Sequence, residues 1–182
     1  MKFQKYMAVG ILGLTMALGF SGCQSENQKN QDAYRKIGIN SMAEGDYDKA
    51  VKSFQKALDT SLGKIGAEEI DICYYKAAAQ FAKKDYDGAI ETYTSLIDYD
   101  KENANAYYLR GSVYLDTDKK DKAFKDYKNA VKYAGREYEI YEGIYENLTN
   151  KGETEEAKKK EIARFTKKRR HSQGRASRSG PH

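Results

Sequence analysis

The chain has 182 residues, enough for one domain of ordinary size, and its only proline is Pro181, so no proline interrupts a helix before that point. The formal net charge is +5, but setting aside Lys2, Lys5 and the seven Lys and Arg residues after residue 163 leaves −4 for residues 23–163. A mildly acidic body lacks the basic surface expected of a nucleic-acid-binding protein, and we predict no nucleic-acid partner.

The N-terminal segment has the three-part layout of a secretory signal peptide. Lys2 and Lys5 precede an apolar run from Met7 to Phe20, and Ser21-Gly22-Cys23 follows. As a helix the apolar run would span about 21 Å at ~1.5 Å per residue, short of the ~30 Å hydrocarbon core of a bilayer. A signal peptide over residues 1–22 is therefore favoured over a permanent transmembrane anchor.

The segment Phe20-Ser21-Gly22-Cys23 resembles the lipobox of bacterial lipoproteins, with Phe20 where leucine is usual. The resemblance implies that the Cys23 thiol receives a diacylglyceryl group, that the leader is cut before Cys23, and that the new amino terminus is often acylated, for example with palmitate. Two acyl chains hold a protein stably at a membrane. The expected location is the extracytoplasmic face of a bacterial cell membrane. Ordinary secretion with a free Cys23 is the alternative.

The residues after Cys23 contain no apolar side chain as far as position 32. Such a composition predicts disorder, so we expect residues 23–32 to be the lipidated cysteine and a flexible tether. As a coil the tether would lift the rest of the chain about 15–20 Å from the membrane, at ~5–6 Å times the square root of its length.

Four copies of one pattern follow, each centred on an alanine. The spacing is 34 residues from Ala89 to Ala123 and from Ala123 to Ala157, and 39 residues from Ala50 to Ala89. A fixed period in this range indicates a repeat array. Apolar residues recur three and four apart on both sides of a turn signal, which predicts two amphipathic helices per copy. The turn signals are Gly45-Asp46, Lys84-Asp85, Asp116-Thr117-Asp118 and Lys151-Gly152.

These copies resemble tetratricopeptide repeats. Three of the copies have an early aromatic residue (Tyr34, Tyr107 and Tyr141), and three have a small residue at the position one turn later (Gly38, Ala77 and Gly111). The central alanine is present in all four copies, and an aromatic residue lies four positions beyond it in the first three (Phe54, Tyr93 and Tyr127). The resemblance implies an all-α fold over residues 33–165, a tetratricopeptide-repeat superhelix of antiparallel helical hairpins (α-α superhelix). The repeats would span about 31–64, 70–103, 104–137 and 138–171.

Two departures from the family pattern concern the ends of the repeats. The proline that usually closes each repeat is missing throughout. The fourth copy has Tyr145 at the small position and Glu161 at the aromatic position, and its Lys- and Glu-rich second half resembles a polar capping helix.

The sequence offers no recognisable catalytic constellation. Both histidines, His171 and His182, lie near the C-terminus, and there is no CxxC pair, glycine-rich phosphate loop or nucleophile elbow. The carboxylates at the hairpin turns are explained by helix capping. We therefore predict that the chain is not an enzyme and has no cofactor, no metal site and no small-molecule substrate.

Members of the family use the first helix of each repeat to line a concave groove that binds a peptide. Carried onto this chain, the groove candidates are Arg35, Ile39, Asp71, Tyr74, Phe81, Asn105, Tyr108, Ser112, Glu139, Glu142 and Glu146. Tyr74 and Tyr108 would stack into a rigid aromatic platform, and the three glutamates would favour a basic partner. These residues could instead be packing or solvated residues. Arg35, Ile39, Asp71 and Asn105 match poorly the Lys and Asn clamp of the subclass that grips carboxyl termini, so a chaperone-tail-binding role is not supported.

The C-terminal segment, residues 166–182, is basic, lacks an apolar period and is predicted to be disordered. It is interpreted as an arm for anionic lipids or wall polymers, as an inert tail, or as the product of a frameshift or truncated gene end. An RNA-binding arm does not fit an extracytoplasmic location.

The expected function is protein–protein interaction by a lipid-anchored scaffold or adaptor, with an unidentified protein or peptide held in the groove. The alternative is an accessory subunit of an envelope machine, such as a cell-wall enzyme or transport complex. A third hypothesis, an enzyme with carboxylates in the groove, has less support.

Overall fold

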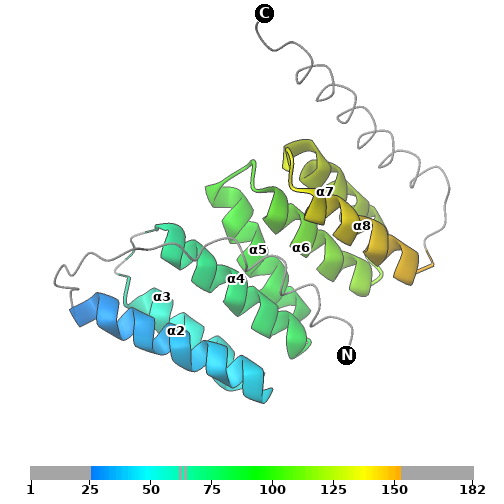
Figure 1. Cartoon of the computed structure of the whole chain (residues 1–182). Helices are drawn as coiled ribbons and strands as arrows, with labels where there is room; N and C mark the ends of the chain where they lie inside the picture. The colour runs from blue at the N-terminus through cyan, green and yellow to red at the C-terminus, as the bar shows by residue number, and fades with distance from the viewer. Residues whose placement is uncertain (1–25, 62, 64, 153–182) are drawn as a thin grey trace, which may run out of the picture. The chain divides into compact units, whose positions relative to one another are not determined.

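A computed structural model describes residues 26–61, 63 and 65–152 of the chain. Within these residues the fold is all-α, with seven helices and no strand (Figure 1). The helices are α2 (Glu26–Glu44), α3 (Tyr47–Asp59), α4 (Ala67–Ala82), α5 (Tyr86–Tyr99), α6 (Ala104–Asp116), α7 (Lys120–Tyr133) and α8 (Tyr138–Asn150). The predicted signal peptide, the predicted lipid site at Cys23, the predicted second half of the fourth repeat and the predicted basic tail lie outside the described residues. No described helix combines the length and the apolar character needed to span a bilayer.

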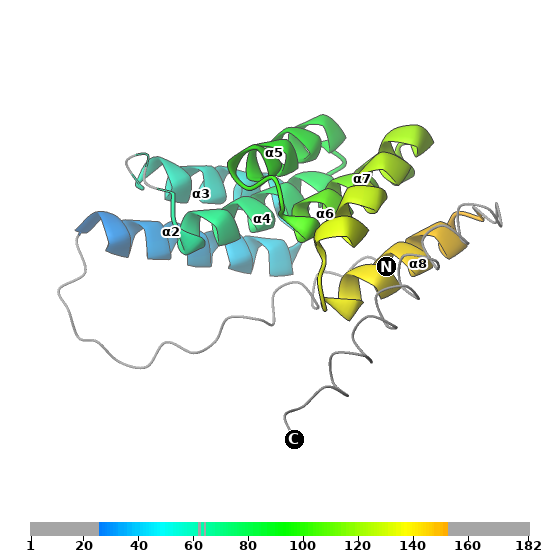
Figure 2. The ribbon, with the colours of Figure 1, turned by 90° about the horizontal axis from the view of Figure 1, so that it is seen from above.

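The described helices fall into two compact units, α2 to α5 in the unit that ends at Lys101 and α6 to α8 in the unit that begins at Glu102. In the first unit α2 packs on α3, α3 on α4 and α4 on α5, and α2 also touches α4 (Figure 2). In the second unit α6 packs on α7, and α8 contacts both. Consecutive helix pairs α2–α3, α4–α5 and α6–α7 are therefore hairpins, as the repeat pattern predicts.

The turns inside the hairpins share one backbone geometry. Gly45, Lys84 and Asp118 adopt positive φ angles of 80°, 67° and 56° directly after the first helix. The next amide reaches back to the last turn of that helix, for example Asp85 N to Gln80 O at 2.8 Å. This is the Schellman arrangement, which satisfies terminal carbonyls and reverses the chain.

Two of the predicted capping carboxylates begin second helices. The Asp46 side chain accepts a hydrogen bond from Lys49 N at 3.0 Å, and Asp85 accepts one from Gly88 N at 3.1 Å. Each bond satisfies one of the amides that the first turn of a helix leaves without a partner. The aspartates at these turns therefore have a structural role.

The cores of the α2–α3 and α6–α7 hairpins are each built on a small residue facing a large one. A Cβ added to Gly38 would lie 2.5 Å from the Phe54 ring, and one added to Gly111 would lie 2.8 Å from the Tyr127 ring. Phe54 and Tyr127 are fully buried. The absence of a side chain at the glycine lets the two helices approach closely enough for the ring to fill the space between them.

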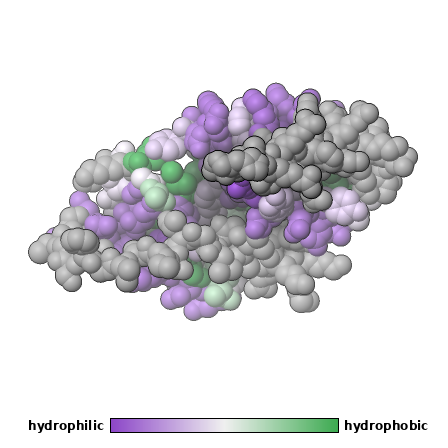
Figure 3. Space-filling model, turned by 45° about the horizontal axis from the view of Figure 1, so that its top comes forward, coloured by the Kyte–Doolittle hydropathy of each residue, from purple (hydrophilic) through white to green (hydrophobic). Residues whose placement is uncertain are grey.

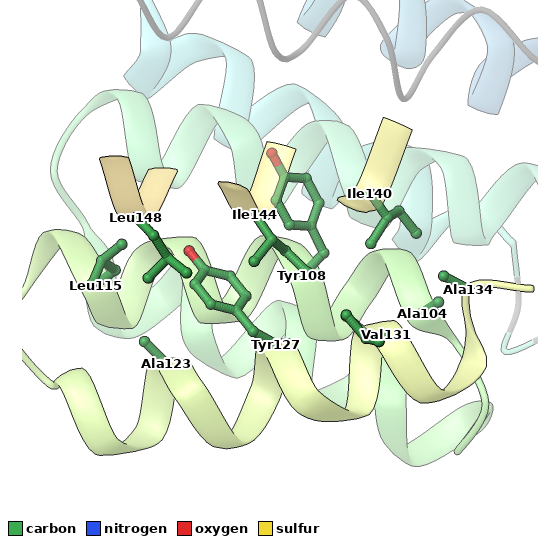
Figure 4. Close-up of a cluster of buried hydrophobic side chains, with 11 residues drawn as sticks. Ala104, Tyr108, Leu115, Ala123, Tyr127, Val131, Ala134, Ile140, Ile144 and Leu148 are labelled. Atoms are coloured by element: carbon green, nitrogen blue, oxygen red, sulfur yellow. The ribbon is translucent and has the colours of Figure 1, made fainter. Parts of the chain in front are cut away.

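The second unit has the larger buried cluster, drawn in Figure 4. Tyr127 and Val131 from α7 pack there with Ile144 and Leu148 from α8, and Tyr108 from α6 completes the cluster. Residues three and four apart line one face of a helix, so α7 and α8 each contribute one stripe to this core. The apolar pattern read from the sequence thus faces inward.

The structure corrects the predicted tether. Residues 26–32 form the first turns of α2, although none of them is apolar. Gln31 is buried, and its amide donates to Glu69 Oε1 in α4 at 2.7 Å. Extending an existing helix costs far less than nucleating one, so a polar segment next to a packed helix can continue it. Cys23 to Ser25 lie outside the described residues.

Candidate protein-binding surface

The predicted binding residues all lie on the first helices of the three described hairpins or on α8. Arg35 and Ile39 are on α2, and Asp71, Tyr74 and Phe81 are on α4, all in the first unit. The second unit carries the rest, with Asn105, Tyr108 and Ser112 on α6 and Glu139, Glu142 and Glu146 on α8. The predicted residues therefore form two separate sets, one in each unit.

In the first unit Arg35 and Asp71 form an ion pair that joins α2 to α4. Arg35 Nε donates to Asp71 Oδ2 at 3.0 Å, and the Nη2 group contacts the same oxygen. The guanidinium also lies 5.3 Å from the centroid of the Tyr75 ring. Burial lowers the pKa of Arg35, but the hydrogen bond and charge of Asp71 outweigh it and raise that pKa overall. The two side chains are thus partners in a link between helices.

A second polar contact between these helices involves two carboxyl groups. Asp32 of α2 and Glu68 of α4 interact through their carboxyl groups, an arrangement that favours a proton on Glu68. Burial, the Asp32 hydrogen bond and the negative charges of Asp32 and Glu69 raise the pKa of Glu68 to about 7, against the lowering effect of Arg35. This contact therefore changes its charge near neutral pH.

The raised pKa predicts a pH-dependent stability. Between pH 4.5 and about 7 the folded chain holds a proton on Glu68 that the unfolded chain releases, so stability should fall as pH rises through this window. Glu68→Gln should remove that part of the slope when the melting temperature is followed across the window. Glu91→Gln, at an exposed site on α5, is the matched control. An unchanged slope in Glu68→Gln would contradict this assignment.

An aromatic and aliphatic surface lies along the same two helices. Tyr74 and Phe81 are half-buried, with ring centroids 6.4 Å from Tyr93 and 5.5 Å from Tyr86. Ile39, also half-buried, packs against the core around Phe54. Each of these side chains is supported by the second-helix layer and retains some accessible area. Rings held this way lose little conformational entropy when a partner binds them.

The structure corrects the interpretation of Tyr108 and Ser112 as surface residues. Tyr108 is only 8% exposed, and its ring occupies the space beside Gly143 of α8. Ser112 is 6% exposed; its hydroxyl donates to Tyr108 O at 2.9 Å and accepts from Asn147 Nδ2 at 2.8 Å. The side of α6 assigned to a groove faces α8 instead, so Tyr108 cannot supply half of an exposed aromatic platform. The signal for this packing was Gly143, whose missing side chain makes room for a tyrosine.

The three glutamates of α8 remain on the surface. Glu139, Glu142 and Glu146 are exposed, and their spacing of three and four residues places them on one side of the helix. Asn105, at the start of α6, is half-buried. The accessible part of the predicted set in the second unit is therefore mainly acidic. Figure 3 shows one face of the molecule, where hydrophilic residues predominate and apolar ones form small patches.

Sequence reasoning missed a buried ion pair in the second unit. Arg110 Nε donates to Asp126 Oδ2 at 2.7 Å, and Arg110 Nη2 donates to Oδ1 at 2.8 Å. The Asp126 side chain is 4% exposed and that of Arg110 is 15% exposed. Tyr107 and Tyr114 flank the guanidinium, each ring centroid 5.8 Å away. The pair joins α6 to α7, and its burial and complete pairing indicate a structural role.

The described residues include no group of three or more His, Cys, Asp or Glu side chains arranged to hold a metal ion. Cys73 is half-buried, and burial raises the pKa of its thiol, which disfavours the reactive thiolate.

The arrangement defines a class of protein, one built from repeated antiparallel helical hairpins. Three family models match the chain, described as tetratricopeptide repeat over residues 35–93, TPR repeat over 77–118 and tetratricopeptide repeat over 104–136. Together they cover residues 35–136, more than half of the chain. The chain belongs to the tetratricopeptide repeat family, whose members generally mediate protein–protein interactions.

Solved structures with the same fold have low sequence identity to the chain. The TPR domain of Arabidopsis OM64 is 17% identical with a TM-score of 0.56, covering 68% of this chain and 98% of that domain. MamA residues 41 to the end, from Desulfovibrio magneticus RS-1, is 21% identical with a TM-score of 0.57, covering 85% and 80%. The first TPR of Spaghetti (RPAP3), bound to the HSP90 peptide SRMEEVD, is 18% identical with a TM-score of 0.55, covering 71% and 98%. No curated protein matches the chain.

Proposed function

We propose that the chain is a bacterial lipoprotein that displays tetratricopeptide repeats on the extracytoplasmic face of the membrane and binds a protein or peptide through its first helices. The observation that carries the binding proposal is the α2–α4 surface. There Tyr74 and Phe81 are half-buried and held by second-helix rings, in a family of interaction modules. The lipid anchor rests on the lipobox resemblance around Cys23.

The charges favour a partner that is not an acidic carboxyl terminus. The RPAP3 repeat binds a peptide ending in Glu-Glu-Val-Asp. In this chain Arg35 is paired with Asp71, and α8 presents Glu139, Glu142 and Glu146. An acidic ligand at the first unit would find the charge of Arg35 already neutralised, and an acidic ligand at the second unit would be repelled by the glutamates of α8. An apolar segment suits the surface of α2 and α4, and a basic segment suits α8.

Replacing Tyr74 tests the binding surface. We expect Tyr74→Ala to lower co-purification of the envelope partner at least tenfold while the helical circular-dichroism signal is retained, since aromatic anchors cost about 2 kcal/mol or more when removed. Tyr99→Ala, at a 56% exposed tyrosine at the end of α5, is the matched control. Equal recovery of the partner with both variants would show that Tyr74 does not contribute to binding.

Replacing Cys23 tests the anchor separately. Cys23→Ala removes the sulfur that would carry the diacylglyceryl group, so the variant is expected to leave the membrane fraction and to lose incorporation of labelled palmitate. A variant that fractionates with membranes as before would contradict lipid anchoring and leave the binding proposal intact.

An accessory subunit of an envelope machine is the second candidate function. The acidic stripe of α8 supports it, because a fixed charged surface suits a stable contact with a basic subunit. Crosslinking in the native envelope followed by mass spectrometry distinguishes the two functions. Constant recovery of one complex favours an accessory subunit, and recovery of several unrelated clients favours an adaptor.

A further inference from the structure

The outer side of α7 is strongly basic, while its inner side packs into the core of the second unit. The exposed charged residues of the helix are Lys120, Asp121, Lys122, Lys125, Lys128 and Lys132. Lys125, Lys128 and Lys132 are three and four positions apart, so they form one line along the exposed side, which we call the lysine row. Asp126, the other acidic residue of α7, is buried and paired with Arg110.

The corresponding sides of the other second helices carry different charges. On α5 the exposed charged residues are Asp87, Glu91 and Asp98, and the helix contains no Lys or Arg. On α3 three exposed lysines accompany two exposed aspartates. The three helices have the same place in their hairpins, so this fold does not require a basic outer side. The lysine row is a property of α7 alone among them.

The lysine row disfavours the helix that carries it. Like charges three or four residues apart on a helix repel each other, and Lys125 with Lys128 and Lys128 with Lys132 are such pairs. A surface serving only solubility would have mixed signs, as α3 does, because opposite charges at this spacing stabilise a helix. An anionic ligand on the outer side of α7 would turn the repulsion into attraction.

Tyrosine rings hold two of the lysines on this side of the hairpin. Lys122 Nζ lies 5.5 Å from the centroid of the Tyr114 ring of α6, and Lys132 Nζ lies 4.5 Å from that of Tyr133. Lys132 also donates to Tyr133 Oη at 2.8 Å, and this hydrogen bond, with the charge of Glu102, raises the pKa of Lys132. Side chains positioned before binding lose less conformational entropy when a ligand arrives.

We propose that the lysine row of α7 binds the surface of an anionic phospholipid bilayer. Three cations on one line of a helix can reach a flat surface together, and each lysine near such a bilayer strengthens binding about fivefold. Within the described residues, the large exposed hydrophobic side chains lie on segments other than α7, so the contact is electrostatic and without insertion. This membrane contact is separate from the partner surface of the first helices and does not require a lipid on Cys23.

The chemistry of the row favours a bilayer over a protein partner. Protein interfaces depend on a few aromatic or arginine anchors buried in pockets, and the lysine row offers neither. A protein would also need carboxylates fixed at matching positions. Lipid headgroups diffuse laterally and can gather beneath the lysines wherever these lie, so a bilayer needs no such match.

Vesicle co-sedimentation tests the contact. The protein is the predicted mature chain with Cys23→Ser, which keeps every described helix and lacks the apolar leader and the thiol. The probe is a vesicle of equal parts phosphatidylglycerol and phosphatidylcholine. We expect the triple variant Lys125→Gln, Lys128→Gln, Lys132→Gln to bind at least about tenfold more weakly than the parent, with unchanged helical circular dichroism.

The matched control is Lys49→Gln, Lys52→Gln, Lys56→Gln, which removes the same charge from α3 and also includes a lysine beside a tyrosine ring. It should change binding by less than about twofold. Both variants retain the basic C-terminal segment, so equal losses would show that net charge alone controls binding and would overturn the proposal. Binding by the parent that persists in about 1 M salt, where the Debye length is about 3 Å, would also overturn it.

Lysine acetylation read by mass spectrometry tests the parent without any substitution. The anionic vesicles should slow the labelling of Lys125 and Lys128 several-fold and leave that of Lys49 and Lys52 unchanged. Protection of the C-terminal lysines alone, or protection of the row by soluble polyglycerol phosphate but not by vesicles, would overturn the proposal. The tests of Tyr74 and Cys23 are independent of these results, so the proposed function and this contact can fail separately.

Discussion

Asp126→Ala is expected to remove about 3–5 kcal/mol of stability, the cost of leaving one buried charge without its partner. Asp126 is 4% exposed and holds both Arg110 nitrogens within 2.8 Å. Without the carboxylate, the guanidinium would remain between two tyrosine rings and two helices with no anion to balance it. Urea unfolding followed by circular dichroism measures the loss. Lys125→Ala, at the exposed neighbouring position, should change stability by less than about 0.5 kcal/mol.

The double variant Arg110→Met, Asp126→Leu separates the cost of an unpaired charge from the value of the pair. Apolar residues of similar size often replace a buried ion pair with little loss, so the double variant should be more stable than Asp126→Ala. If the double variant were as unstable as Asp126→Ala, the ion pair itself would be the source of the lost stability. If Asp126→Ala cost less than about 1 kcal/mol, the pair would behave as a solvated surface contact.

Tyr127→Ala is expected to cost about 3–5 kcal/mol, the usual range for removing a fully buried ring. Tyr127 is 0% exposed and lies against Gly111, whose lack of a side chain leaves a space that alanine at 127 cannot fill. Its hydroxyl donates to Ser112 Oγ at 3.4 Å and accepts from Asn147 Nδ2 at 3.3 Å. Burial raises the pKa of this hydroxyl, so it stays neutral at physiological pH.

Tyr127→Phe is the matched control for that prediction. It keeps the ring and removes only the hydroxyl, so it should cost about 1 kcal/mol, the value of a typical hydrogen bond. The difference in urea midpoint between the two variants then measures the ring alone. Equal losses would mean that the hydroxyl contacts, and not the packing against Gly111, hold α7 in place.

The features that the sequence predicted well are those in which a residue's type is set by the space around it. Gly38 and Gly111 must be small because the rings of Phe54 and Tyr127 occupy their Cβ positions. The turn at Gly45 needs a positive φ, which glycine adopts without strain. The small–large pair recurs in two hairpins and the positive-φ turn in three, so their period identifies the fold without any knowledge of distant contacts.

The features that the sequence missed depend on contacts between helices. The polar start of α2 is fixed by Gln31 bonding to Glu69, a residue in another hairpin. Tyr108 is buried because Gly143, 35 residues later, makes room for it. In both places the composition of the segment alone favours a different interpretation, a tether for the first and a surface residue for the second.

The most direct test of the central claim, that the first helices bind a protein partner, is site-specific photocrosslinking in the native envelope. A benzophenone amino acid in place of Tyr74 on α4 should give one dominant adduct, identified by mass spectrometry. The same amino acid in place of Tyr99, the exposed tyrosine at the end of α5, should not. Adducts of equal yield at both positions, or none at Tyr74, would contradict recognition through the first helices.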